Sequence, residues 1–288
     1  MIAGLVLLVI VAAAAALATR RALFLYRLVR AGKPVQRFDD VPVRVRNEAV
    51  VVLGQRKLFQ RLVPGLIHAF IFWGFLVLFP TIIMAVIGIV DRGSSIPWLG
   101  GQGWFAFLVD LFAVLVLAGV IAALYIRKVV RPRRFEGSHL READLILLAI
   151  ATIVVSLLLW HASLVALGLN EWPASQAPIS NALSNLFGGG SGTEELERVL
   201  VWVHVLTILG FMVYLPYSKH LHIATAGINV YFGRTRARGR LEPLDLDEEL
   251  PEEQLRFGTS TIADMTWKQM VDTMSCTECG RCQDVCPA

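Results

Sequence analysis

Residues 62–90 read LVPGLIHAFIFWGFLVLFPTIIMAVIGIV and contain no charged side chain. A helix needs about 20 mostly apolar residues to cross the roughly 30 Å of hydrocarbon in a bilayer. Four other stretches meet this requirement: Ile2–Thr19, Trp104–Ile126, Leu145–Leu169 and Val199–Pro216. The sequence therefore predicts an all-α membrane protein with five transmembrane helices.

The composition supports this class and divides the chain into parts. The 288 residues are 56% hydrophobic and only 17% charged, whereas an ordinary soluble domain carries about 25% charged residues. Residues 234–288 hold 11 of the 23 acidic side chains. These features exclude a soluble globular enzyme and a disordered chain. We expect a transmembrane domain over residues 1–232, a charged cytoplasmic linker over 233–263 and the start of a second domain over 264–288.

Basic residues in the loops predict the orientation in the membrane. Of the 27 Lys and Arg residues, 25 fall on one side of the predicted helices, and Arg92 and Arg198 fall on the other. Loops rich in Lys and Arg stay in the cytoplasm. The N-terminus is therefore expected outside the cell and the polar C-terminal part inside, in a multi-pass protein that contacts membrane lipid.

Four cysteines give the most specific chemical signal. Cys276, Cys279, Cys282 and Cys286, followed by Pro287, form the pattern C-x2-C-x2-C-x3-C-P. Thiolates at this spacing bind [4Fe–4S] clusters, whereas structural zinc sites usually have two cysteine pairs separated by a longer insert. We predict the start of a helical ferredoxin-like iron–sulfur domain at residues 264–288.

The fourth cysteine leaves two arrangements open. In proteins with this pattern it commonly binds a second cluster, whose other ligands lie elsewhere in the chain. No second run of cysteines occurs here, so we expect the chain to be the N-terminal piece of a longer protein. A single cluster bound by all four cysteines is the alternative.

Four histidines lie in or at the ends of apolar helices, where polar groups are costly and often functional. Residues His204 and His222 are 18 positions apart, which is five turns of one helix that we expect to continue through a bend at Pro216. Counted along the helices, His68 falls at the level of His222, and His161 falls close to the level of His204. The histidines thus predict haem b axial ligands, as an inner pair (His68 and His222) and an outer pair (His161 and His204). Each histidine is explained equally well by a hydrogen bond to a neighbouring helix, and His220 is an alternative to His222.

One acidic residue, Asp110, lies well inside a predicted span. It is a candidate proton relay to a quinone. An ion pair with Arg92, or a hydrogen bond to Ser or Thr on another helix, is the structural alternative.

The last predicted helix resembles the last helix of the cytochrome b (gamma) subunit of respiratory nitrate reductase. The matching residues are His204, Gly210, Pro216, Tyr217, Ser218, Lys219 and His222, with His68 in the second helix. That family has a five-helix fold and two b haems, so the resemblance implies a five-helix cytochrome b bundle. The family has another histidine ten residues after the one at His68. Leu78 stands at that position here, and His161 is our proposed substitute.

The whole chain resembles the membrane-bound, heterodisulfide-reductase-like iron–sulfur oxidoreductases of bacteria. This resemblance implies a quinone-linked iron–sulfur oxidoreductase of the bacterial inner membrane, of which this chain is the membrane and electron-entry part. Electrons would pass between the cytoplasmic iron–sulfur domain and menaquinone or ubiquinone through b-type haem. In some members the soluble donor is an electron-transfer flavoprotein, and no nucleic acid partner is expected. The alternative is a haem-free membrane anchor that docks a cytoplasmic iron–sulfur oxidoreductase.

Overall fold

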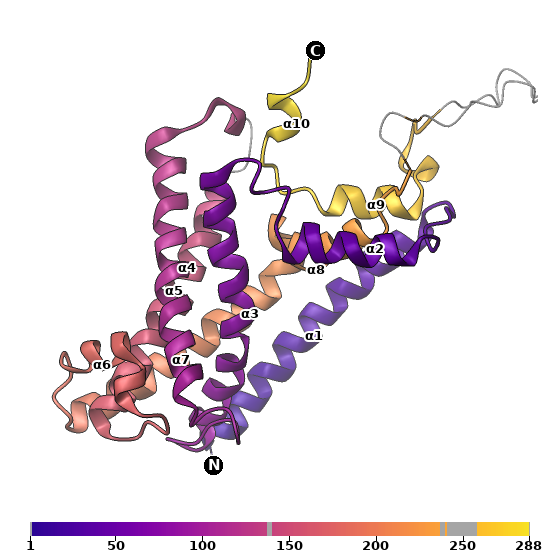
Figure 1. Cartoon of the computed structure of the whole chain (residues 1–288). Helices are drawn as coiled ribbons and strands as arrows, with labels where there is room; N and C mark the ends of the chain where they lie inside the picture. Colours follow the sequence, from indigo (N-terminus) through magenta and orange to yellow (C-terminus); the bar gives the residue numbers. More distant parts are fainter. Residues whose placement is uncertain (1, 137–139, 237–239, 241–257, 288) are drawn as a thin grey trace, which may run out of the picture. The chain divides into compact units, whose positions relative to one another are not determined.

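The computed structural model describes residues 2–136, 140–236, 240 and 258–287. These residues form helices and connecting turns (Figure 1). The chain divides into two compact units. The first contains residues 1–18, 58–215 and 278–288, and the second contains residues 19–57 and 216–277. The predicted linker lies largely in residues 241–257, outside the described part of the chain.

The prediction of five membrane-length helices is confirmed. Five helices are long and apolar enough to cross a bilayer, and their bounds are Ile2–Ala31 (α1), Leu62–Val90 (α3), Gly103–Val130, Arg141–Leu167 and Ser191–Tyr217. Within the last three, α4 spans Gly103–Tyr125, α5 spans Leu140–Leu167 and α7 spans Ser191–Tyr214. The first helix runs well past its predicted end at Thr19, because the Arg, Leu and Ala residues that follow favour helix.

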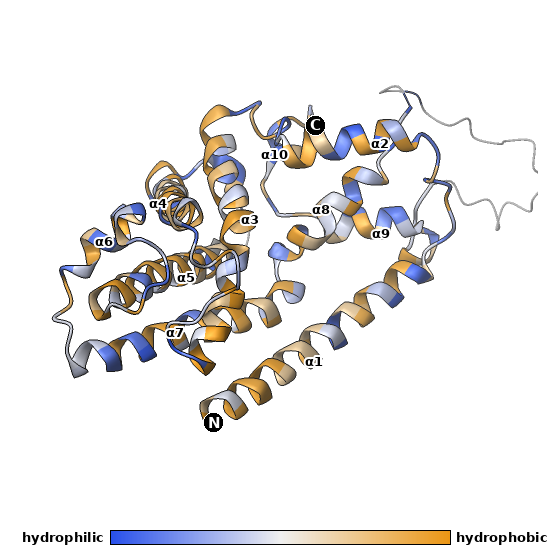
Figure 2. Cartoon of the chain, turned by 60° about the horizontal axis from the view of Figure 1, so that its bottom comes forward, coloured by the Kyte–Doolittle hydropathy of each residue, from blue (hydrophilic) through white to orange (hydrophobic). Residues whose placement is uncertain are grey.

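Small residues let the helices of the first unit approach closely. A Cβ atom on Gly74 of α3 would lie 2.1 Å from the side chain of Val116 on α4, and one on Gly88 would lie 3.0 Å from the ring of Trp160 on α5. Such contacts let helix backbones pack closely, which matters because the hydrophobic effect does not drive helix association within lipid. Large apolar side chains such as Phe79 instead point outward, 51% exposed, and Figure 2 shows these helices as mostly apolar. This surface suits lipid contact.

A buried carboxylate ties three segments of this unit together. Glu197 on α7 is 1% exposed. Its oxygens accept hydrogen bonds from Nε1 of Trp160 on α5, at 3.1 Å, and from Nε of Arg92, just after α3, at 2.9 Å. The pairing of Arg92 with Glu197 neutralises a charge that would be costly to bury alone.

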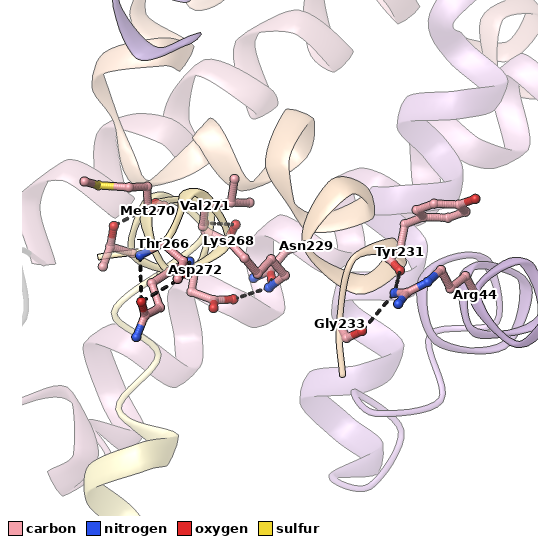
Figure 3. A network of polar contacts seen from close by, with 12 residues as sticks. Arg44, Asn229, Tyr231, Gly233, Thr266, Lys268, Met270, Val271 and Asp272 are labelled. Carbon is pink, nitrogen blue, oxygen red and sulfur yellow. Dashed lines mark hydrogen bonds and ion pairs between the residues drawn. The ribbon is translucent and has the colours of Figure 1, made fainter. Parts of the chain in front are cut away.

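The second unit combines the end of α1 with short helices. These are α2 (Val41–Asn47), a π-helical segment (Glu48–Leu53), α8 (His222–Tyr231) and α9 (Trp267–Met274). Buried Arg44 on α2 donates from Nη1 to the carbonyl oxygens of Tyr231 and Gly233, at 2.7 and 2.9 Å (Figure 3). These are carbonyls at the C-terminus of α8, which lack partners within the helix, so the guanidinium caps it.

Helix α9 is fixed to the segment that follows α1. The amide of Lys33 donates to the carbonyl of Met265 at 2.8 Å, and the amide of Trp267 donates to the carbonyl of Lys33 at 3.0 Å. A Cβ atom at Gly32 would lie 2.5 Å from the backbone nitrogen of Trp267. Glycine is therefore needed at position 32 for this close approach.

Candidate functional site

His204 on α7 is held in an orientation suited to metal binding. The residue is 1% exposed, and its Nδ1 lies 2.9 Å from the carbonyl oxygen of Ile153 on α5 and 3.2 Å from the hydroxyl of Ser156. A carbonyl only accepts, so Nδ1 donates its proton there and Nε2 keeps its lone pair. Nε2 is buried and has no hydrogen-bond partner. Metal-ligating histidines commonly show this arrangement, with the second ring nitrogen fixed by a carbonyl.

His161 lies in the same buried region but at a different level of α5. It is 2% exposed, and its Nε2 also has no hydrogen-bond partner. Its ring centroid is 4.7 Å from that of Trp172 and 5.2 Å from that of Trp160. The Trp160 ring also lies 6.4 Å from the ring of His204. His204 contacts α5 at Ser156, and five further residues correspond to about 7.5 Å along the helix axis. The structure thus gathers both histidines around Trp160, with His161 beyond the level that His204 contacts.

The prediction that His204 and His222 share one continuous helix is wrong. Helix α7 ends at Tyr214, and Leu215–Tyr217 forms a 3-10 turn. Pro216 has no amide proton for the helical ladder, and Ser218 is extended, with its hydroxyl accepting from the amide of His220 at 3.2 Å. His222 therefore begins a separate helix, α8, in the second unit.

The two inner candidates, His68 and His222, belong to different units. His68 is half-buried on α3, with its ring stacked on that of Phe72 at a centroid distance of 6.4 Å. In the second unit, Nδ1 of His222 lies 2.9 Å from the carbonyl oxygen of Lys219, which leaves Nε2 unprotonated in the neutral ring. Burial lowers the pKa of His222 and so favours this neutral form.

Asp110 accepts hydrogen bonds from a short helix in the same unit. One carboxylate oxygen accepts from the amides of Ile179 and Ser180, at 2.8 and 2.9 Å, and the other accepts from the Ser180 hydroxyl at 2.6 Å. Both residues lie in the first turn of α6 (Pro178–Ser184). A hydrogen bond to serine on another helix is thus present, and a proton-relay role for Asp110 stays a hypothesis.

The side chains of the four cysteines are exposed. Cys276 follows α9 in the second unit, and the other three belong to the first. Glu278 and Gly280, on either side of Cys279, have left-handed backbones, with φ of 51° and 71°, so the chain turns sharply around Cys279. Within the described ranges, no three His, Cys, Asp or Glu side chains are gathered as metal ligands. The four thiol donors and their spacing in the sequence are therefore the features that fit an iron–sulfur cluster.

Sequence reasoning missed Glu197 as an individual residue. It lies seven positions before His204, so two helical turns place the two residues on the same face of α7. That spacing is a signal which could have identified it. Glu197 accepts a hydrogen bond from Trp160, whose ring lies beside both buried histidines.

Comparisons with known proteins cover the iron–sulfur segment and most of the rest of the chain. A family model described as a 4Fe-4S binding domain matches residues 267–288. The chain is 31% identical over 263 residues to "Probable iron-sulfur-binding oxidoreductase FadF" of Bacillus subtilis, covering 88% of this chain and 35% of that protein. It is 28% identical over 265 residues to "EtfAB:quinone oxidoreductase" of Syntrophomonas wolfei, covering 88% of this chain and 36% of that protein.

This chain thus spans about a third of the length of these two curated relatives. No solved structure matches it. Together with the cysteine pattern, the comparisons support an iron–sulfur oxidoreductase with membrane-spanning helices.

Proposed function

We propose that this chain is the membrane part of a quinone-linked iron–sulfur oxidoreductase and carries electrons between a cytoplasmic [4Fe–4S] domain and the quinone pool through b-type haem. The matched 4Fe-4S domain supports the iron–sulfur end. The name of the Syntrophomonas relative supports an electron-transfer flavoprotein as soluble donor and a quinone, menaquinone or ubiquinone, as acceptor. The observation that carries the haem part is the buried, unpartnered Nε2 of His204 beside its anchored Nδ1.

The residues around His204 prepare it to bind iron. Ile153 and Ser156 fix the tautomer and the ring orientation, so the lone pair on Nε2 need not be reorganised when metal binds. The buried surroundings exclude water from that nitrogen. When bound, haem b and a [4Fe–4S] cluster would supply reversible one-electron transfer, and the protein contributes their positions and potentials.

The other proposed ligands follow from the sequence. His161 is the proposed second ligand of the outer haem, and its unpartnered Nε2 supports this role. His68 and His222 are the proposed inner pair, as the nitrate reductase resemblance implies. The ring of His222 is neutral and hydrogen-bonded to a carbonyl, which supports its proposed role as a ligand of the inner haem. Cys276, Cys279, Cys282 and Cys286 are the proposed cluster ligands.

The basic loops support an orientation with the N-terminus outside and the cysteines in the cytoplasm, and the resemblance to the bacterial oxidoreductases implies the inner membrane. In this orientation the cysteines face soluble donors. The apolar outer faces of the five long helices provide contact with lipid and access for a lipid-soluble quinone.

Visible spectroscopy of the purified full chain, combined with iron and acid-labile sulfide analysis, tests this proposal. The wild type should show the α band of reduced b-type haem and the broad absorption of an iron–sulfur cluster. Replacing His204 by Ala should remove the outer haem, and H222A should remove the inner one. H220A is the matched control and should retain both.

Two results would contradict the proposal in different ways. A wild-type chain with cluster absorption but no haem band would identify the haem-free membrane anchor instead. Haem content unchanged in H204A would mean that the unpartnered Nε2 has no part in haem binding. Retention of two haems in H161A would exclude His161 alone and leave the rest of the proposal in place.

A further inference from the structure

The cysteine-bearing segment of the first unit lies against basic residues near the ends of two membrane helices. Arg61, which precedes α3, forms an ion pair with Asp284 of α10 (Arg281–Asp284). The 3-10 turn Arg133–Phe135, which follows α4, contacts the same short helix. This segment therefore contacts Arg61 and the turn Arg133–Phe135 within the first unit.

Gly280 makes this docking close. A Cβ atom at position 280 would lie 2.0 Å from the carbonyl oxygen of Arg134, and the φ angle of 71° is itself unfavourable for other residues. Gly280 directly follows Cys279 and stands two positions before Cys282. The backbone of Arg134 is thus packed against the turn that joins two proposed cluster ligands.

The side chain of Arg134 has an unused hydrogen-bond donor at this place. Its Nε is buried and has no hydrogen-bond partner, and its guanidinium lies 5.1 Å from the ring centroid of Phe135. A buried donor on a charged group is costly to leave without an acceptor. We therefore looked for a group that could accept a hydrogen bond from Nε of Arg134.

We propose that Arg134 donates a hydrogen bond from Nε to a sulfur of the [4Fe–4S] cluster bound by this cysteine segment, and thereby raises the reduction potential of that cluster. The proposal rests on the proposed cluster. Thiolates and sulfides make such a cluster negatively charged, and reduction adds a further negative charge. Hydrogen bonds to sulfur and nearby positive charge stabilise the reduced form, which raises the potential.

A redox titration of the cluster, followed by electron paramagnetic resonance on the full chain, tests this role. Replacing Arg134 by Gln should make the cluster about tenfold harder to reduce, which is about 59 mV for one electron. R133Q is the matched control, because Arg133 belongs to the same turn but is exposed, and solvent screens its charge. R134K keeps the charge but changes the donor geometry, so its potential should fall between those of the wild type and R134Q.

The outcomes separate this inference from the proposed function. A wild-type chain without iron and labile sulfide overturns both. An intact cluster with the same potential in R134Q and the wild type overturns the role of Arg134 alone, as do equal shifts in R134Q and R133Q. If R134Q loses its cluster, R134K decides the question: a lowered potential supports the Nε donor, and a wild-type potential overturns it.

Discussion

Replacing Lys268 by Met should loosen α9, the helix that leads into the first cysteine. Lys268 is only 7% exposed. Its ammonium donates to the side-chain oxygens of Asn229 on α8 and of Asp272 one turn ahead on α9, both at 2.5 Å (Figure 3). Methionine keeps most of the apolar stem that packs in this position but removes the ammonium.

The expected cost is dominated by the contact with Asn229. A hydrogen bond from a charged group is worth about 1.5–3 kcal/mol. The side chain of Asp272 is half exposed, so its i,i+4 pair with Lys268 adds only about 0.3–0.5 kcal/mol. Relief of the cost of burying an ammonium offsets part of this. We therefore expect a net loss of about 2 kcal/mol, which is about a 30-fold shift in the local opening equilibrium.

Hydrogen exchange of the full chain in lipid nanodiscs measures this effect. Amides of residues 267–274 should exchange about 30-fold faster in K268M, whereas those of α3–α5 should be unchanged. K33M is the matched control, because Lys33 is 58% exposed where it pairs with Asp264. Exposed pairs contribute about 0–1 kcal/mol. Exchange in α9 that is equally fast in both variants would refute the role assigned to the Lys268 ammonium.

Three further predictions concern other positions. G32A should detach α9 from the end of α1, since the new Cβ would meet the backbone of Trp267; faster exchange in α9 would show this. D110N should loosen α6, because Asn has one acceptor oxygen for three donors; loss of quinone reduction without faster exchange in α6 would instead favour a proton relay. Hydrogen bonds from Thr261, and then from Lys33, lower the pKa of Asp264 from 3.8 to about 2. Its contacts should therefore stabilise the fold fully above about pH 4 and weaken as the pH falls toward 2, and D264N should remove this dependence of the α9 exchange rate.

The number and type of the membrane helices could be predicted from the sequence, because apolar length alone sets them. Leu62–Val90 was predicted to the residue. Helix ends were predicted less well where local chemistry competes. Four arginines lie between Thr19 and Ala31, yet the helix continues to Ala31. Hydropathy measures immersion in lipid and not helix propensity.

The site was predictable only in part, for a related reason. Spacing along one ideal helix placed His204 and His222 on one face, but Pro216 and Ser218 end that helix between them. The hydrogen bond from His204 to Ile153 depends on how α5 packs on α7, which no single-helix count can predict. Likewise, Gly280 and Arg134 are far apart in the sequence but in close contact in the structure. No sequence motif predicts this contact.

Within the second unit, helix α8 lies between two proposed ligands, His222 and Cys276. It begins at His222, and two turns later its Asn229 holds Lys268 of α9. Helix α9 ends at Met274, two residues before Cys276. His222 and Cys276 both belong to the second unit, so the path from the proposed haem ligand to the first cysteine runs through the packed helices α8 and α9. The distance between His222 and Cys276 should therefore depend on contacts within this unit, such as that of Lys268, and not on the length of the predicted linker. Inserting residues within 241–257 should leave the exchange of α9 unchanged, whereas K268M should not.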